Sequence, residues 1–187
     1  MFTAMIAFDQ ASHTYTVNGV IIQRSCTSLV NSYFASFDSQ KMVDKYYSRW
    51  KAQNDQRHAH HMHLDDDSAK RAIIAEWNAT AQTAATRGTL IHKWAEEMLT
   101  LHTFRESPEL EQIKLFIAEF GLTFFKAEIP TWYADDGIVV SAGTVDALFK
   151  DADDNIILVD WKRSKKPLVD TGGFGVGRRP LEHIKDC

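Results

Sequence analysis

The hydrophobic pattern of this 187-residue chain changes its period at Gly121, and this change limits the folds open to it. Upstream, apolar residues recur at helical spacing. Downstream, apolar and polar residues alternate in three segments, at about 123–133, 138–149 and 156–162. Turn-forming residues join these segments at Asp135 to Gly137 and at Asp151 to Asn155. The order predicts an α+β fold in which helices precede an antiparallel β-meander.

The region before the meander predicts a smaller hairpin and a series of helices. Residues 15–22 alternate in polarity around Asn18-Gly19, which is a tight-turn dipeptide. Residues that can cap or begin a helix precede several apolar stripes. We expect helices to begin near Thr27, Asp38, Ser68, Thr86 to Gly88 and Ser107-Pro108.

Residues 52–67 interrupt the helical pattern with a segment rich in histidine and aspartate. Imidazole and carboxylate groups are metal ligands, so a structural metal site is one interpretation. The segment has no apolar stripe or turn signal that fixes these side chains in space, which favours a solvated loop. The residues concerned are His58, His60, His61, His63, Asp65, Asp66 and Asp67.

The formal net charge is −4, from 21 lysines and arginines and 25 aspartates and glutamates. This balance argues against a protein that coats nucleic acid by bulk charge. It is compatible with an enzyme that meets nucleic acid at one basic patch beside an acidic site. Residues 163–187 offer such a patch, a Gly-rich tail that we expect to be flexible. Its basic residues include Arg163, Lys165, Lys166, Arg178 and Arg179.

The cysteine count favours an intracellular protein. Cys26 and Cys187 do not make a disulfide framework, which indicates a reducing environment. The start of the chain, MFTAMIAFDQ, lacks the basic region and long apolar stretch of a secretory signal. No run of about eighteen apolar residues is present, so we expect no membrane span.

The second hairpin of the meander holds the strongest candidate site. The loop from Asp151 to Asn155 sets Asp146 directly opposite Asp160 on the neighbouring strand. Two facing carboxylates about 5 Å apart repel each other unless a cation lies between them. Lys162 follows Asp160 by two residues, so it lies on the same face. This set is typical of metal-assisted phosphodiester hydrolysis, and a surface salt bridge is the alternative.

Three further residues are secondary candidates. His92 and Glu96 lie one turn apart on the flank of a helix, where a helix packed on a sheet presents side chains to a cleft. A helix-stabilising contact between these two is the alternative interpretation. Glu128 lies on the first strand of the meander, and its face depends on the register across the turn at Asp135 to Gly137.

Three segments resemble the motifs of one nuclease group, in the same order along the chain. Residues 87–96, which include Gly88-Thr89, His92 and Glu96, resemble the Gly-Thr-x-x-His-x-x-x-Glu helix of RecB-like nucleases. The sequences AGTVDALF at 142–149 and VDWK at 159–162 resemble the next two motifs. This group is the branch of the PD-(D/E)XK superfamily that holds RecB, the CRISPR-associated relatives and the mitochondrial genome maintenance exonuclease.

The resemblance implies a restriction-endonuclease-like core over residues 86–162. Residues 1–85 then form an N-terminal hairpin and helical region, and residues 163–187 form the basic tail. Members of this branch usually follow the lysine with a helix that bears Gln-x-x-x-Tyr. This sequence reaches Cys187 without such a helix, which indicates a truncated product or a fragment.

The resemblance also assigns roles to individual residues. It implies that His92, Asp146, Asp160 and the carbonyl of Trp161 bind Mg²⁺ or Mn²⁺, and that Lys162 is the catalytic lysine. The expected activity is hydrolysis of DNA phosphodiester bonds, with exonuclease action on single-stranded ends. Two alternatives stay open, namely a catalytically incomplete DNA-binding module and an RNA endonuclease of the cap-snatching kind.

Overall fold

A computed structural model describes residues 5–9, 12 and 14–164 of this chain. The chain divides into two compact units. The described parts of Met1–Ala35 and Leu90–Cys187 form the first unit, and Ser36–Thr89 form the second. One helix, α3 (Asp66–Leu101), contributes residues to both. Among the described residues, no helix combines the length and the apolar character needed to cross a membrane.

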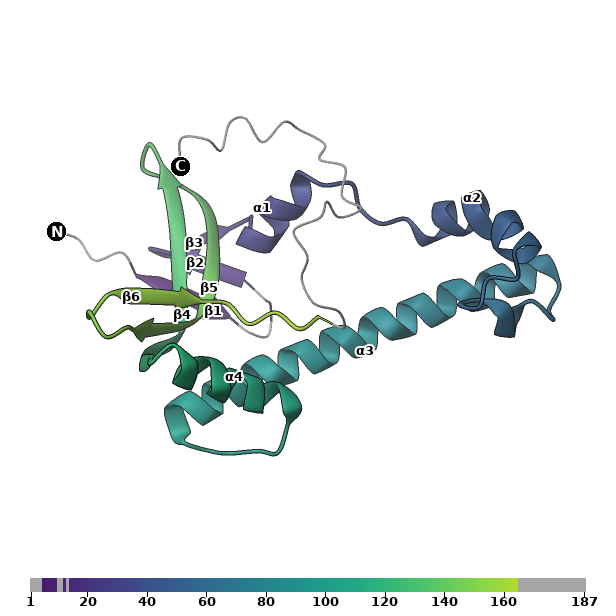
Figure 1. The fold of residues 1–187 in the computed structure, drawn as a ribbon. Coiled ribbons are helices and arrows are strands. Elements are labelled where there is room, and N and C mark those ends of the chain that lie inside the picture. The colour runs from purple at the N-terminus through teal and green to yellow at the C-terminus, as the bar shows by residue number, and fades with distance from the viewer. Residues whose placement is uncertain (1–4, 10–11, 13, 165–187) are drawn as a thin grey trace. The chain divides into compact units, whose positions relative to one another are not determined.

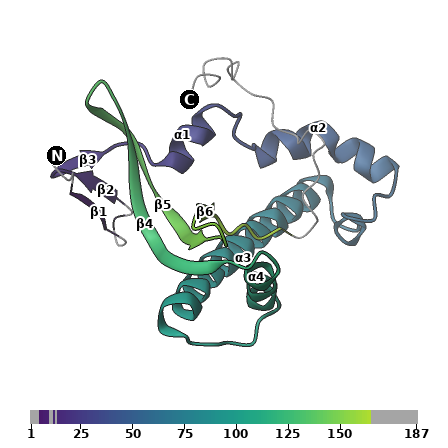
Figure 2. The ribbon, with the colours of Figure 1, turned by 60° about the vertical axis from the view of Figure 1, so that its left-hand side comes forward.

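The first unit contains the antiparallel meander that the sequence predicts. Its strands are β4 (Thr123–Asp135), β5 (Ile138–Lys150) and β6 (Ile156–Val159), in that order across the sheet. Figure 2 shows β4 and β5 as a long, curved pair with β6 beside one end. The strand expected to reach residue 162 ends at Val159, because the chain leaves the sheet and Trp161 packs into the core. The α+β fold class is therefore confirmed.

Two helices accompany this sheet in the first unit. They are the C-terminal part of α3 and the helix α4 (Pro108–Glu119), which lie side by side in Figure 1. Buried residues between the helices form one cluster: Ile91, Ala95, Met98, Leu110 and Ile113. Ala147, Phe149 and Val159 form a second cluster on the sheet. Trp161 borders both clusters, so the helices and the sheet share one core.

A second small sheet precedes these elements. Its strands β1 (Ile6–Asp9), β2 (Thr14–Val17) and β3 (Val20–Ile22) are antiparallel and lie in sequence order. The hairpin at Asn18-Gly19 is confirmed, with φ values of 50° and 80° at its turn, whereas β1 was not predicted. Helix α1 (Cys26–Ser32) follows and is capped by the Ser25 side chain rather than by Thr27.

The N-terminal sheet and α1 attach to the middle of β5. The Tyr15 hydroxyl lies 2.9 Å from the Thr144 hydroxyl. The backbone N–H of Ala142 donates to the carbonyl of Arg24 over 3.2 Å. The sequence predicts the hairpin as part of a separate region, residues 1–85, and does not predict this contact. The reason is that the sequence of a hairpin does not indicate which distant strand it packs against.

We expect Gly143→Ala to lower the free energy of unfolding of the first unit by about 1–3 kcal/mol, because it overpacks this contact. A Cβ atom at Gly143 would lie 2.8 Å from the Sγ of Cys26 and 3.2 Å from its Cβ. Combining it with Cys26→Ala removes the closer clash and restores part of the loss. Urea denaturation followed by circular dichroism measures the change.

Gly88→Ala, in the part of α3 that belongs to the second unit, controls for the general effect of replacing a glycine by alanine. Gly88 lies inside α3 with open space around it, so the added methyl group raises helix stability by about 0.5–1 kcal/mol. Equal effects of the two substitutions would contradict the close packing of Cys26 on β5.

The second unit packs helix α2 (Ser39–Ala52) against the first turns of α3. Asp38 caps α2 as predicted, by accepting a hydrogen bond from the backbone of Lys41. The core contains Val43, Tyr47, Trp50, Ala69 and Ile73. The interpretation of residues 52–67 as a solvated loop is wrong, because the segment includes a 3-10 helix, η1 (Ala59–His61), and the buried His58.

Helix α3 is continuous where two helices were expected. The sequence predicts a new helix near Thr86 to Gly88, but the helix runs from Asp66 to Leu101 without a break. A glycine in a helix interior costs about 1 kcal/mol relative to alanine, which is too little to end a helix whose flanking residues continue it. The Arg87-Gly88-Thr89 segment is therefore a mid-helix segment rather than a helix start.

Stability of the second unit is expected to fall as the pH drops from about 7 to about 5. Burial lowers the pKa of His58, which is 6% exposed and lies 4.6 Å from the Trp50 ring, ring centre to ring centre. Because the folded state then binds fewer protons than the unfolded state, whose histidine titrates at about 6.5, acidification favours unfolding. Melting curves recorded by fluorescence should show this loss.

The variant His58→Phe tests the cause of that loss. It keeps an aromatic ring between Trp50 and Trp77 and removes both the titration and a buried Nδ1 atom that has no hydrogen-bond partner. Its melting temperature should change less over the same pH range. An equally steep pH dependence in the variant would show that other groups are responsible.

Candidate active site

Asp146 is the centre of the site and is held by three elements. It lies on β5 between the segment that meets Arg24 and the segment that pairs with β6, and it is 9% exposed. Its Oδ1 lies 3.2 Å from the Nδ1 of His92 on α3. Its Oδ2 accepts a hydrogen bond of 2.6 Å from the backbone N–H of Trp161. A helix, a strand and the segment after β6 therefore meet at one carboxylate.

The ionisation of this pair reflects its surroundings. Burial acts to raise the pKa of Asp146, but the hydrogen bonds from His92 and from the Trp161 N–H outweigh it and lower the pKa. The Asp146 carboxylate in turn raises the pKa of His92, against the effect of burial, and a backbone hydrogen bond with Trp161 adds to this. The aspartate is therefore an anion over the whole neutral range.

Asp160 stands beside Asp146 in the register that the sequence predicts. Ala147 pairs with Val159, and the pairs that follow keep this register. Asp146 and Asp160 are the next residues on each chain, one position past the last pair. The loop that sets this register is held by Asp151, whose side chain accepts hydrogen bonds from the backbone of Asp153 and Asn155.

Lys162 is close to Asp160, as the sequence suggests. Strand alternation is not the reason, because β6 ends at Val159, before both residues. Its ammonium group lies 2.7 Å from a carboxylate oxygen of Asp160. The side chains of Lys162 and Asp160 are 70% and 47% exposed. Asp160 therefore faces Lys162 at the surface, while Asp146 faces His92.

Glu128 lies on the other side of Asp146. Ala127 and Ile129 pair with Ala147 and Val145, so the register sets Glu128 across from Asp146 on β4. Glu128 has a φ of 48°, a left-handed conformation that is unusual for a non-glycine residue within a strand. Partial desolvation raises its pKa, and the carboxylates of Glu96 and Asp146 raise it further.

The cluster therefore gathers several of the candidate residues around one buried carboxylate. Imidazole nitrogen and carboxylate oxygens are a donor set that suits Mg²⁺ or Mn²⁺. Burial, and after it the charges of Glu96 and Asp146, raise the pKa of Glu128, and a bound cation relieves the repulsion between these carboxylates. On both counts, the chemistry of these residues suits a divalent metal ion.

The predicted ligands do not all converge, however. Within the described part of the chain, no three histidine, cysteine or acidic ligand atoms of this cluster lie within 4.8 Å of one another. The structure brings His92 and the Trp161 backbone to Asp146 and leaves Asp160 with Lys162.

The predicted nucleic-acid contacts lie mostly beyond the described residues. Arg163 forms an ion pair of 3.1 Å with Glu109 at the start of α4. The other basic residues of the tail are outside the described residues: Lys165, Lys166, Arg178 and Arg179.

Comparison with known proteins adds no relative to this picture. No protein-family model matches the chain, and neither the curated proteins nor the solved structures contain a match.

Proposed function

We propose that this chain is a divalent-metal-dependent nuclease that hydrolyses DNA phosphodiester bonds. The observation that carries the proposal is the pair of contacts at the buried Asp146, whose carboxylate meets His92 and the backbone N–H of Trp161. The register places Glu128 across from Asp146 on one side and Asp160 on the other. Lys162 lies next to Asp160. We further propose that residues 86–162 form a restriction-endonuclease-like core and that the enzyme acts as an exonuclease on single-stranded ends.

The proposed metal ligands are His92, Asp146, Asp160 and the carbonyl of Trp161. A bound Mg²⁺ or Mn²⁺ supplies positive charge to the scissile phosphate and lowers the pKa of an attacking water. Asp146 is held in place by the hydrogen bond from the Trp161 N–H. Its other oxygen lies 3.2 Å from the His92 Nδ1, so these two groups must exchange their mutual contact for contacts with the metal. Asp160 must exchange its ion pair with Lys162, and a surface ion pair of this kind is worth only about 0–1 kcal/mol.

Lys162 is the proposed catalytic group. Its long, exposed side chain reaches the same surface as the carboxylates, so its ammonium group can hold the attacking water or offset the negative charge that builds up on the phosphate. Glu96 and Glu128 are secondary candidates that add negative charge around Asp146. Basic residues of the tail, with Arg163, would contact the nucleic-acid backbone.

A catalytically incomplete DNA-binding module is the second candidate. The ion pair between Asp160 and Lys162 favours it, since both groups are engaged with each other rather than with a shared ligand. A nuclease specific for RNA, of the cap-snatching kind, is the variant within the enzyme class.

The deciding experiment incubates the purified chain with end-labelled single-stranded DNA, duplex DNA and RNA. Each substrate is tested with Mn²⁺, with Mg²⁺ and with EDTA. We expect cleavage of DNA that either metal supports and that EDTA abolishes. Binding that weakens steeply with salt, ignores divalent ions and never leads to cleavage would instead identify the binding module. Preferential cleavage of RNA would establish the cap-snatching variant.

A further inference from the structure

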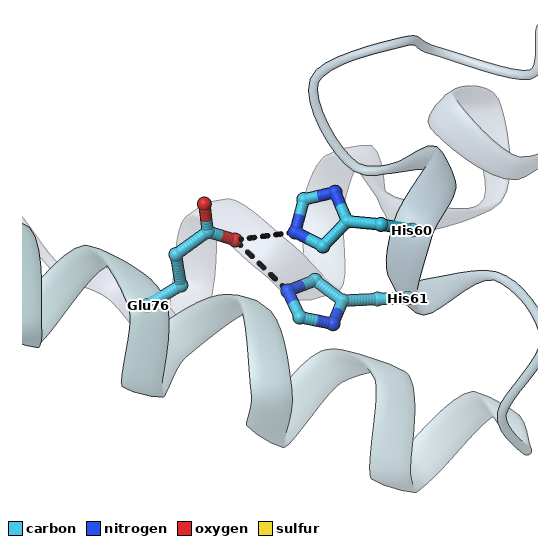
Figure 3. Close-up of side chains that lie close together, drawn as sticks. All are labelled: His60, His61 and Glu76. Atoms are coloured by element: carbon cyan, nitrogen blue, oxygen red, sulfur yellow. Dashed lines mark hydrogen bonds and ion pairs between the residues drawn. The ribbon is translucent and has the colours of Figure 1, made fainter.

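Three metal-binding side chains outside the proposed active site point at one another in the second unit. His60 and His61 belong to η1, and Glu76 lies on α3 (Figure 3). The Nε2 atoms of His60 and His61 lie 3.1 Å and 2.8 Å from the same oxygen of Glu76, Oε2. The three ligand atoms all lie within 4.8 Å of one another.

The turn that carries these histidines is fixed in place by its neighbours. His58, just before η1, is buried between the rings of Trp50 and Trp77. Met62 and Leu64, just after it, pack against the core of the second unit. The ligand-bearing residues are therefore anchored on both sides and face a rigid helix. The packing on both sides fixes the positions of these histidines, although the segment has no apolar stripe that predicts it.

The spacing and chemistry of the three donors match a zinc site. Donor atoms around a tetrahedral zinc ion are about 3.3 Å apart, given bond lengths of about 2.0–2.1 Å. The two nitrogen–oxygen distances, 3.1 Å and 2.8 Å, are slightly shorter than that spacing, and the two nitrogens lie within 4.8 Å of each other. Two imidazoles and one carboxylate form a known set of three protein ligands for zinc, with a fourth position left for water. Partial exposure of His60 and Glu76 leaves this position open to solvent.

Hydrogen bonding alone is the competing explanation of the same geometry. Two imidazoles can share one carboxylate oxygen only if both carry a proton on Nε2. A metal ion needs both Nε2 atoms deprotonated. A metal site therefore predicts that the chain binds a divalent cation at this cluster, and hydrogen bonding alone predicts that it does not.

We propose that His60, His61 and Glu76 bind Zn²⁺, or a divalent ion of similar preference, and that the ion fastens η1 to α3. The site is independent of the proposed nuclease centre, because all three ligands belong to the second unit. The ion would join a short turn to a helix, in the open three-ligand coordination rather than the closed four-ligand coordination of structural zinc sites.

Titration of the EDTA-treated full chain with Zn²⁺, followed by calorimetry, tests the proposal. We expect the affinity to fall at least about tenfold in His61→Ala and in Glu76→Gln. Co²⁺ in place of Zn²⁺ should give the visible absorption of a tetrahedral site in the wild type and lose it in both variants. His63→Ala is the matched control, because it removes an exposed histidine of the same segment that is outside the cluster.

The variant Glu76→Gln keeps the test decisive if His61→Ala fails to fold, since Glu76 is exposed and glutamine has the same size. Repeating the titrations in the Asp146→Asn background separates the two proposals. This change disables the proposed nuclease centre, so Zn²⁺ binding that remains there and is lost on adding Glu76→Gln belongs to the cluster of His60, His61 and Glu76. The proposal is overturned if the wild type binds no Zn²⁺, or if Glu76→Gln or a folded His61→Ala binds it as tightly as the wild type.

Discussion

Lys162→Ala should reduce metal-dependent cleavage of DNA by about 10²–10³-fold while the chain stays folded. The loss follows from the position of its ammonium group beside the acidic cluster, where it can stabilise charge that develops in the transition state. The fold should survive because the side chain is 70% exposed, and its ion pair with Asp160 contributes at most about 1 kcal/mol. Initial rates at saturating Mn²⁺, with circular dichroism for folding, measure both effects.

Lys150→Ala is the matched control for this prediction. Lys150 is also a lysine of the meander that pairs with an aspartate, Asp154, at 2.6 Å, so its removal changes the net charge by the same amount. Lys150 is the last residue of β5, next to the loop that follows the strand and away from Asp146. We expect its cleavage rate to match that of the wild type. A loss in Lys150→Ala as large as that in Lys162→Ala would mean that general charge, not a catalytic group, explains the result.

Much of the candidate site follows from the sequence because local chemistry sets the register of one hairpin. Asp151 accepts backbone hydrogen bonds inside its own loop, so the loop closes in one way. That closure places Asp146 next to Asp160, as the pairing of Ala147 with Val159 confirms. Helical periodicity likewise sets His92 on the flank of its helix, where it meets Asp146.

The position of Glu128 does not follow from the sequence, and the reason is a strand irregularity. The turn pairs Asp135 with Ile138, and that register, continued along the strands, would place Ala127 opposite Asp146. A shift between Tyr133 and Ala134 moves the pairing by one residue and brings Glu128 across instead. Such irregularities leave no reliable trace in the composition of a strand.

The histidine-rich segment shows a different limit. Its composition indicates metal ligands, but the partner that completes the cluster, Glu76, lies on a helix that starts after the segment. The packing of His58 between Trp50 and Trp77 is also a contact between distant parts of the chain. Periodicity within a segment cannot report either contact, because both depend on how α3 packs against α2 and η1.

Phe149→Ala should lower the free energy of unfolding of the first unit by about 3–5 kcal/mol. Phe149 is completely buried, and its ring centre lies 5.9 Å from that of Phe124 and 6.3 Å from that of Trp161. Truncation therefore leaves a cavity between the sheet and the helices. Urea denaturation measures the loss. Phe125→Ala is the control, because Phe125 is 54% exposed on β4 and should cost no more than about 1 kcal/mol.

The same substitution should also weaken catalysis beyond what partial unfolding explains. Trp161 packs edge-on against Phe149, and its backbone N–H donates to Asp146. A cavity beside the indole ring loosens the segment that fixes the proposed metal ligand, so the apparent affinity for Mn²⁺ should fall in conditions where the variant is fully folded. Unchanged Mn²⁺ dependence in folded Phe149→Ala would show that the contact between Phe149 and Trp161 does not help to position Asp146. The core of the first unit would then stabilise the fold without affecting the position of Asp146.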